Sequence, residues 1–308
     1  MLRREVEEAE LVVYGRACPN CGGFISDRRL ALGVPCSSCL RELPKSLDYR
    51  SVYRVLKEEG TLKGFKEYYV FRETYSDLVK FFVECLGSEP WSIQKMWLRR
   101  IAKEGSFAMI APTGVGKTTF GFVVALYLAR KGKKSYIVVP TTTLAMQAEK
   151  KLNELAGRAN LIVSPVVIHS KLRKREREAR EEQLESGSFD ILVTTSNYLL
   201  RNAERILKHR FKFIFVDDVD AVLKGSKAIN YLLRLTGFSE RDIEAGMEII
   251  RLRREAAYLS SLQARSEKLE KRLQEIRERL EKLRNRIERK GRERRILIIA
   301  SATGNPRG

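Results

Sequence analysis

Histidine is scarce in this sequence, and long apolar runs are absent from it. There are 2 histidines in 308 residues. Neither His169 nor His209 has an evident acidic or cysteine partner, so we expect both to be structural or surface residues. No apolar run reaches the roughly 18 residues that a membrane-spanning helix needs. The opening residues MLRREVEEAE also lack the apolar core of a secretory signal. We therefore expect a cytoplasmic protein that does not use a membrane as a partner.

Acidic residues are also fewer than basic residues. The sequence has 59 Lys and Arg residues against 39 Asp and Glu residues, which gives a formal net charge of +20. Such a surplus favours a polyanionic partner, most commonly nucleic acid, although a lysine-rich surface can also serve solubility alone. The strongly basic residues 171–177 are equally compatible with a solvated helix face and with a contact to DNA phosphates. Hydrophobic residues make up 44% of the chain, which is enough for a core and argues against global disorder.

Four of the five cysteines form two CxxC pairs near the amino terminus. Cys18 pairs with Cys21 and Cys36 with Cys39, and this separation predicts one tetrahedral Zn²⁺ held by four thiolates. Four protein ligands leave no open position, so we expect a structural zinc. A block of about 40 residues buries too little apolar surface to fold alone, so metal binding would supply its folding free energy. The fifth cysteine, Cys85, lies in an apolar stretch and is expected to be a buried, inert thiol.

The chain divides into three predicted domains. We expect a four-cysteine zinc finger over residues 1–45, a helical linker over residues 46–90, and an α/β domain over residues 91–308. The α/β domain carries a long helical insertion at about residues 224–293. Elsewhere in it, short β-branched apolar runs alternate with helix-forming stretches, which predicts a parallel sheet covered by helices. The expected strands are FAMIA, SYIVVP, LIVSPVVI, DILVTT, FKFIFVDD and RILIIASAT.

A phosphate-binding loop follows the first of these strands. From Ala111 the sequence reads APTGVGKT, with a strand before it and a helix after it. Glycines in this pattern let backbone N–H groups turn toward phosphate oxygens, and the start of the helix adds its dipole. Lys117 is expected to reach the β- and γ-phosphates of ATP, and the Thr118 hydroxyl to ligate Mg²⁺. The nucleotide-binding residues predicted in the loop are Thr113, Gly114, Val115, Gly116, Lys117, Thr118 and Thr119.

The apolar stretch FKFIFV ends in a pair of acids, Asp217 and Asp218. Downstream of a phosphate loop, an acid at the end of a buried strand is expected to hold the Mg²⁺ of the nucleotide, directly or through water, and Asp217 occupies that place. Asp218 is placed to orient or deprotonate the attacking water. We therefore predict Lys117, Asp217 and Asp218 as the catalytic residues, and Thr118 and Asp217 as the magnesium ligands.

Together these motifs resemble the superfamily 2 helicases, close to the DEAD-box group. Residues 140–144 with Gln147, and residues 194–199, resemble segments that contact the nucleic-acid backbone in that family. Residues 301–303 resemble the motif that couples the ATP state to domain closure in that family. The DEAD-box group has glutamate where Asp218 stands. Aspartate is shorter by one methylene, and turnover would be slow if this weakens the positioning of the attacking water.

The resemblance also implies how the adenine base is recognised. Gln94, in the stretch WSIQKMW, stands where the family uses a glutamine to read adenine. The aromatic side chain that stacks on the base could be Phe81, Phe82 or Trp91. The sequence does not distinguish among these three.

The match becomes more specific when the motifs are taken in combination. A four-cysteine finger followed by PWSIQ, APTGVGKTTFG, DDVD and ASATG resembles reverse gyrase over nearly the whole chain. That resemblance implies a RecA-like helicase domain that works with a type IA topoisomerase to introduce positive supercoils into DNA, using ATP. We expect ATP, Mg²⁺ and Zn²⁺ as cofactors and single- and double-stranded DNA as partners.

The sequence stops after the coupling motif. A second RecA-like domain and a topoisomerase part are therefore expected as further partners, in cis or as a separate chain, and the isolated chain is expected to be only weakly active. Two alternative functions remain open. One is an ATP-binding nucleic-acid switch that barely hydrolyses ATP, and the other is a fragment of a DEAD-box-type RNA helicase.

The insertion at residues 224–293 has a coiled-coil pattern. From Leu262 onward, leucine and isoleucine recur with heptad spacing, interrupted once by Ser266, and this predicts a helix over residues 260–290. At 1.5 Å per residue the helix would be roughly 45 Å long. A single apolar seam needs a partner. An antiparallel hairpin with a preceding helix at about residues 242–258 is favoured over a homodimer.

Overall fold

The computed structural model describes most of the chain. The described residues are 12–222, 226–262, 266–288 and 295–302. The chain divides into two compact units, Met1–Lys80 with Pro90–Lys103 and Phe81–Glu89 with Glu104–Gly308. None of the described helices is long and apolar enough to span a bilayer.

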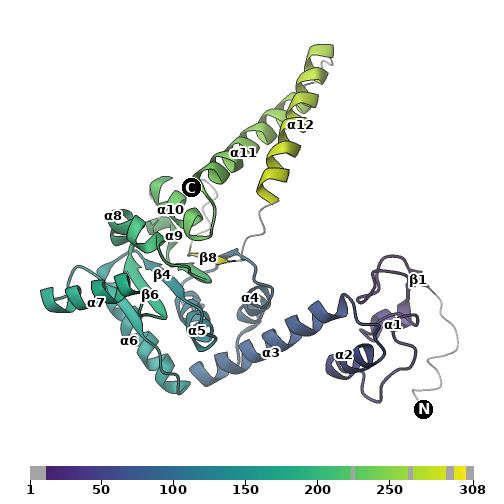
Figure 1. Ribbon diagram of the computed structural model, residues 1–308, viewed down its shortest axis with the longest axis horizontal. Helices are drawn as coiled ribbons and strands as arrows, with labels where there is room; N and C mark the ends of the chain where they lie inside the picture. Colours follow the sequence, from purple (N-terminus) through teal and green to yellow (C-terminus); the bar gives the residue numbers. More distant parts are fainter. Residues whose placement is uncertain (1–11, 223–225, 263–265, 289–294, 303–308) are drawn as a thin grey trace. The chain divides into compact units, whose positions relative to one another are not determined.

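The amino-terminal unit is a zinc finger followed by helices (Figure 1). Its elements are the antiparallel strands β1 (Val13–Tyr14) and β2 (Ile25–Ser26) and the helices α1 (Asp27–Ala31), α2 (Tyr49–Glu58), the first part of α3 (Phe65–Leu86) and α4 (Ser92–Ala102). Helix α2 begins after Asp48, whose carboxylate accepts hydrogen bonds from the backbone N–H groups of Arg50 and Ser51 at 2.9 and 3.1 Å. This cap satisfies two of the donors left unpaired at the start of a helix.

The apolar core of the finger extends beyond residue 45, where the predicted finger ended. Val52 and Leu56 of α2 and Phe65 of α3 are buried against the three buried cysteines. The block of residues 1–45 contributes few apolar side chains of its own, so the zinc-binding loops need these helices to close their core. The predicted helical linker is therefore partly a structural component of the finger.

The larger unit is built on a single sheet (Figure 1). Its six strands are β3 (Phe107–Ile110), β4 (Ser135–Val139), β5 (Pro165–Ile168), β6 (Ile191–Thr195), β7 (Phe213–Val216) and β8 (Ile296–Ser301). They lie in the order β3-β8-β7-β4-β6-β5, and each neighbouring pair is parallel. The structure confirms the predicted RecA-like parallel sheet, and each strand falls within one of the expected apolar runs.

Helices cover both faces of this sheet. They are α5 (Lys117–Arg130), α6 (Thr142–Arg158), α7 (Lys174–Ser186) and α8 (Ser196–Leu207), with the short α9 (Val219–Val222) after β7. Every residue of β4, β6 and β7 is buried. Strands covered on both sides need continuous apolar runs rather than alternating ones, which is why these runs were recognisable in the sequence.

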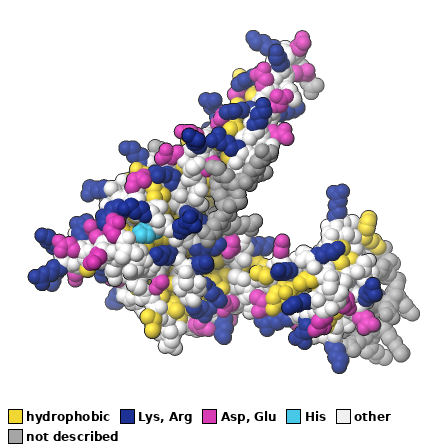
Figure 2. Space-filling model, in the orientation of Figure 1, with side chains coloured by type: hydrophobic (Ala, Val, Ile, Leu, Met, Phe, Trp, Pro, Cys, Tyr) yellow, Lys and Arg dark blue, Asp and Glu magenta, His cyan; other side chains and the backbone are white. Residues whose placement is uncertain are grey.

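The insertion folds as the predicted hairpin. It contains α10 (Ser226–Leu235), α11 (Glu240–Ser261) and α12 (Glu267–Glu288), and α11 packs along α12 (Figure 1). Ile276 and Leu283 of α12 are buried against Ala245 and Leu252 of α11. Figure 2 shows Lys or Arg and Asp or Glu side chains interspersed along this arm.

The predicted start of the second hairpin helix was wrong. Instead of one helix over residues 260–290, α11 ends at Ser261 and α12 begins at Glu267. Leu262, which the heptad pattern placed in the seam, is the residue after α11 and is 41% exposed. Two antiparallel helices need a connection, and this one falls at the position of the first heptad residues.

Close packing of α5 on β7 depends on a glycine. An added β-carbon at Gly121 would lie 2.6 Å from a ring carbon of Phe215, well inside van der Waals contact. We predict that Gly121→Ala destabilises the protein by about 1–3 kcal/mol, the usual cost of overpacking a core. Chemical denaturation followed by circular dichroism measures this change.

A glycine in open space supplies the control. At Gly246, in the middle of α11, nothing lies within 4 Å of an added β-carbon. Gly246→Ala should therefore stabilise the protein by about 0.5–1 kcal/mol through the helix propensity of alanine. Equal effects of the two substitutions would contradict the packing account.

Candidate nucleotide site and zinc centre

The phosphate loop joins the end of β3 to the start of α5. Gly114 and Gly116 have φ values of +85° and +82°, in the left-handed region that favours glycine. Gly116 is the residue immediately before α5, so Lys117 and Thr118 occupy its first turn. The loop glycines are therefore required by the backbone path that brings these two side chains to the start of the helix.

The side chain of Lys117 lies across the loop. Its ammonium group donates hydrogen bonds to the carbonyl oxygens of Ala111 and Pro112 at 2.6 and 2.8 Å. These contacts hold the charged Nζ over the loop that would carry the phosphates. The lysine is thus positioned by the backbone of its own motif.

Thr118 and Asp217 meet directly. The Thr118 hydroxyl donates a hydrogen bond of 2.7 Å to the carboxylate of Asp217, although 99 residues separate them in the sequence. Thr118 begins α5, while Asp217 directly follows β7. The structure therefore brings together the two side chains predicted to be magnesium ligands.

Asp217 is held rigidly at the edge of the sheet. Its backbone N–H donates to the carbonyl of Val138 at 2.9 Å, which continues the pairing of β7 with β4 by one residue. The residue is only 8% exposed. Burial raises the pKa of the Asp217 carboxyl, and the hydrogen bond from Thr118 acts in the opposite direction. A buried carboxylate of this kind is stabilised by a nearby cation.

Asp218 has a different environment from its neighbour. It is exposed and adopts a left-handed conformation with φ +52°, which is uncommon for a residue with a side chain. Its carbonyl accepts hydrogen bonds from the backbone N–H groups of Ala221 and Val222, which starts α9. The chain thus turns sharply after Asp217. Of the two predicted catalytic aspartates, Asp217 is buried and Asp218 is exposed.

The coupling motif touches both halves of this site. The Ser301 hydroxyl, at the end of β8, donates to the carboxylate of Asp220 in α9. The backbone carbonyl of Ser301 also accepts from the N–H of Ala111, the first residue of the phosphate loop, at 3.3 Å. Thr303, the third residue of the predicted motif, lies outside the described residues.

Two hollows flank the carboxyl edge of the sheet. Thr118, Thr119 and Asp217 line a cleft that also includes Gln147 of α6. The other hollow is a groove that joins the two segments predicted to contact nucleic acid. Its lining includes Thr141, Thr142, Asn197, Tyr198, Arg177 and Arg201.

A hydrogen bond joins two of the segments that line the groove. The hydroxyl groups of Thr142 and Ser170 are hydrogen bonded at 2.9 Å, which links the segment after β4 to the segment after β5. Arg177, the last residue of the basic stretch 171–177, belongs to α7 and lines the groove. His169 also lines it and is buried, and desolvation lowers the pKa of its imidazole.

Gln94 caps a helix in the amino-terminal unit. Its side-chain oxygen accepts a hydrogen bond of 2.9 Å from the backbone N–H of Trp91, at the start of α4. The three aromatic alternatives differ in exposure. Phe81 and Phe82 are each 1% exposed and belong to the core, whereas Trp91 is 62% exposed. Trp91 is therefore the one of the three whose ring is open to a ligand, and adenine recognition by Gln94 stays a prediction.

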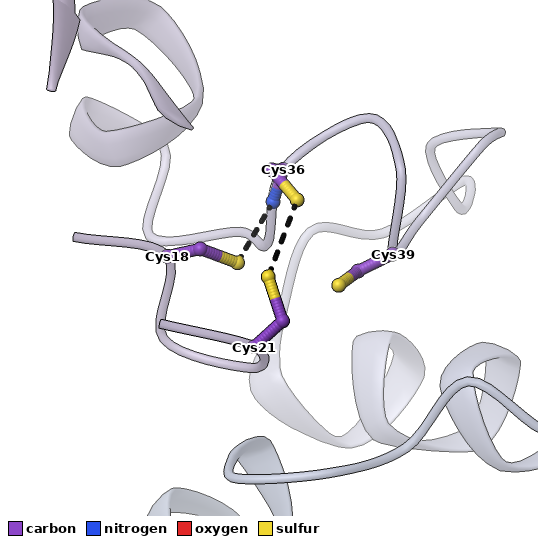
Figure 3. A group of neighbouring side chains, drawn as sticks. All are labelled: Cys18, Cys21, Cys36 and Cys39. Atoms are coloured by element: carbon purple, nitrogen blue, oxygen red, sulfur yellow. Dashed lines mark hydrogen bonds between the residues drawn. The ribbon is translucent and has the colours of Figure 1, made fainter. Parts of the chain in front are cut away.

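The four finger cysteines converge on one point, and their sulfur atoms face one another (Figure 3). All four sulfurs lie within 4.8 Å of one another, and those of Cys21 and Cys36 are 3.8 Å apart. Tetrahedral zinc with Zn–S bonds of about 2.3 Å requires sulfurs roughly 3.8 Å apart, so the cluster fits the metal. Burial raises the pKa of the Cys39 thiol to about 12. Four thiolates this close repel one another, and a bound cation would offset that repulsion.

Backbone amides support the cluster. The N–H of Cys36 donates to the sulfur of Cys18, and the N–H of Gly23 donates to that of Cys21, each at 3.3 Å. Such second contacts orient metal ligands and delocalise their charge. The geometry is that of a closed, structural site.

Asn20 is a structural residue that the sequence reasoning missed. It lies inside the first CxxC pair and is 3% exposed. Its side chain accepts from the N–H of Lys63 at 2.7 Å and donates to the carbonyl of Thr61 at 2.9 Å. The Thr61 hydroxyl in turn donates to the carbonyl of Cys39 at 2.8 Å. Asn20 and Thr61 thus tie the loop between α2 and α3 to both cysteine pairs.

Comparison with protein families identifies both units. The reverse gyrase zinc finger family matches residues 10–63, which confirms the four-cysteine finger and includes the loop held by Asn20. The DEAD/DEAH box helicase family matches residues 91–243. That match extends from the residues before α4 through the phosphate loop and β7 to the start of α11.

Individual relatives align along almost the whole chain. Reverse gyrase 1 of Aeropyrum pernix is 44% identical over 96% of this chain and 22% of its own length. The reverse gyrase of Pyrococcus furiosus is 47% identical over 96% of this chain and 25% of its own length. Reverse gyrase 1 of Aquifex aeolicus is 41% identical over 96% of this chain and 24% of its own length. The chain therefore spans a quarter or less of the length of each of these relatives.

The zinc centre makes a direct prediction about metal content. We expect one Zn²⁺ per chain in protein purified without chelator, and we expect Cys39→Ser to lose it because three thiolates bind zinc more weakly than four. Elemental analysis measures the metal, and limited proteolysis reports the loss of structure in the finger. Cys85→Ala is the control, because Cys85 is buried away from the cluster. Zinc retained at full stoichiometry by Cys39→Ser would exclude the four-thiolate site.

Proposed function

The chain is homologous to the amino-terminal region of reverse gyrases, and we propose that it is the part in which ATP binding and hydrolysis drive the handling of DNA strands. The observation that carries this proposal is the 2.7 Å contact between Thr118 of the phosphate loop and Asp217 at the end of β7. A phosphate loop and a strand-end acid in contact form the minimal site for a magnesium nucleotide.

The residues present fit a magnesium-bound triphosphate. The Thr118 hydroxyl and the Asp217 carboxylate are oxygen donors, which Mg²⁺ prefers, and Asp217 is buried where a cation would offset its charge. Bound Mg²⁺ would neutralise charge on the β- and γ-phosphates. Lys117 would exchange its hydrogen bonds to Ala111 and Pro112 for bonds to phosphate oxygens. Glycines 114 and 116 leave the backbone free to approach the phosphates.

Asp218 is suited to handle the attacking water. Its exposure leaves the carboxylate accessible, and its backbone is in the left-handed region. Holding a residue in this region costs of order 1 kcal/mol, which is the kind of strain that accumulates at functional sites. Asp218 would orient the water or accept its proton while Asp217 keeps its charge toward the metal.

Ser301 would report the nucleotide state to the rest of the motor. It contacts the phosphate loop through Ala111 and the acid motif through Asp220. A shift of either segment on hydrolysis therefore reaches the end of β8. In a two-domain motor this is the point from which closure onto a second RecA-like domain would be controlled.

DNA is the proposed partner of the groove at the carboxyl edge. Arg177 and Arg201 supply positive charge there, and hydroxyl and amide side chains from two segments supply hydrogen bonds. The net charge of +20 supports a polyanionic partner as well. We propose that the complete activity is positive supercoiling of DNA in the cytoplasm. This chain would carry it out together with a second RecA-like domain and a topoisomerase part.

The nucleotide site is tested by replacing its lysine. We expect Lys117→Ala to bind ATP at least 100-fold more weakly, on the order of 3 kcal/mol, because a charged contact to the phosphates is lost. Calorimetric titration with Mg²⁺-ATP measures the affinity. Lys131→Ala, just after the opposite end of α5, removes the same charge away from the loop and should bind ATP like the wild type.

Hydrolysis separates a motor from a switch. Single-stranded DNA should raise the ATP turnover of the wild-type chain well above background, and Lys117→Ala should abolish that rise. Unchanged ATP affinity in Lys117→Ala would refute the nucleotide site. Tight ATP binding without any stimulation by DNA would favour the switch over the motor.

A further inference from the structure

A group of basic side chains lies at the end of the sheet opposite the nucleotide loop. Residues 132–134 lead into β4, and residues 210–212 lead into β7. These two segments line one pocket, here named the amino-edge pocket. The carboxyl ends of the same two strands lead to Pro140 and Asp217. Across the 5 residues of β4, at about 3.3 Å per residue, the two edges are roughly 16 Å apart.

The charge of the amino-edge pocket is strongly one-sided. Its lining includes Lys133, Lys134, Arg210 and Lys212, together with Gly132 and Phe211, and no acidic residue. The carboxylate of Glu104 pairs with Lys212 at 2.8 Å. The end of α5 adds about half a negative charge through its helix dipole. The four cations that line the pocket outnumber the Glu104 carboxylate paired with Lys212 and this partial charge, so the lining keeps a positive surplus.

Two of these cations are fixed in place. The Lys134 ammonium donates to the carbonyl of Gly187 at 2.7 Å and lies 4.7 Å from the ring centre of Phe189. Lys212 is held by its ion pair, and its side chain is 14% exposed. The backbone N–H of Lys212 donates to the carbonyl of Lys134 at 2.9 Å, so the two segments are joined at this point. The pocket is therefore carried by strand ends and not by a mobile loop.

The other two cations are available to a ligand. Lys133 and Arg210 are exposed, and neither forms an ion pair with any residue that the structure describes. Lys133 follows the tight turn that ends α5, in which Gly132 has φ +67° and the N–H of Lys133 donates to Leu128. An arginine and a lysine presented side by side by rigid segments suit the oxygens of a phosphate group.

We propose that the amino-edge pocket binds phosphate groups of the DNA backbone, at a second contact separate from the groove at the carboxyl edge. This inference rests on the proposed function, in which DNA is the partner. It places DNA at an edge of the sheet that carries none of the helicase motifs. DNA held at both edges would be bound along the side of the motor, and each phosphate contact would release counterions.

A double charge reversal tests the pocket in the full chain. We expect Lys133→Glu with Arg210→Glu to lower the affinity for a short labelled DNA duplex. The slope of log affinity against log salt should fall by about 2, because each lost phosphate contact removes roughly 0.9. Fluorescence anisotropy over a salt series measures both quantities. Both side chains are exposed, so folding should be unchanged, and the milder Lys133→Gln with Arg210→Gln guards against misfolding.

A matched reversal elsewhere controls for net charge. Lys282→Glu with Arg284→Glu, on exposed positions of α12, changes the total charge by the same amount and should alter the salt slope by less than 1. Basal ATP hydrolysis without DNA should be normal in both variants. An equal effect of the two reversals, or a wild-type slope in the pocket variants, would overturn the proposal.

A third double substitution distinguishes failure of the pocket proposal from failure of the proposed function. Arg177→Glu with Arg201→Glu alters the groove at the carboxyl edge. If this pair weakens DNA binding while the pocket pair does not, the pocket proposal fails and the DNA function stands. A wild-type chain that does not bind DNA at all would refute both. Competition by inorganic phosphate alone, with an unchanged DNA slope, would identify a site for a small anion and also overturn the proposal.

Discussion

The contact between Thr118 and Asp217 sets the requirements for the whole larger unit. The Thr118 hydroxyl lies at the start of α5, which follows β3, and the Asp217 carboxylate directly follows β7. The two groups can meet only if β3 and β7 have their carboxyl ends at the same edge of the sheet. A fully parallel sheet provides this, and its order places β8 between β3 and β7. Ser301 at the end of β8 therefore lies between the loop and the acid motif, where it contacts Ala111 and Asp220. Ser301 therefore owes its position to the strand order.

The amino-terminal unit solves a different problem with metal and polar contacts. Its cysteine loops are too short to bury an adequate core of their own. Metal binding by the four sulfurs, which lie within 4.8 Å of one another, would supply the missing folding free energy. Asn20 then uses its buried amide to bind the loop after α2, and Thr61 binds the second cysteine pair. These hydrogen bonds join the cysteine loops to the loop after α2, and the family match extends over the same residues, to residue 63.

The sequence predicted those features that follow from local patterns. Glycine spacing predicted the phosphate loop, buried runs predicted the strands, and the CxxC separation predicted the sulfur cluster. It could not predict Asn20, because its role depends on a loop more than 40 residues away. It left the stacking ring open among Phe81, Phe82 and Trp91, because the exposure of each ring depends on tertiary packing. Leu262 was misplaced because a heptad pattern does not mark where a hairpin must turn. The sequence did not indicate the amino-edge pocket, because the two segments that line it meet only in the folded sheet.

The magnesium dependence of nucleotide binding tests the central contact most directly. Calorimetric titration with ATP, with and without Mg²⁺, should show that the metal tightens binding to the wild-type chain. In Asp217→Asn this tightening should be lost, while the affinity for ATP without metal stays close to that of the wild type. If Asp217→Asn keeps the full effect of Mg²⁺, then Asp217 does not hold the metal and the account of the site is wrong.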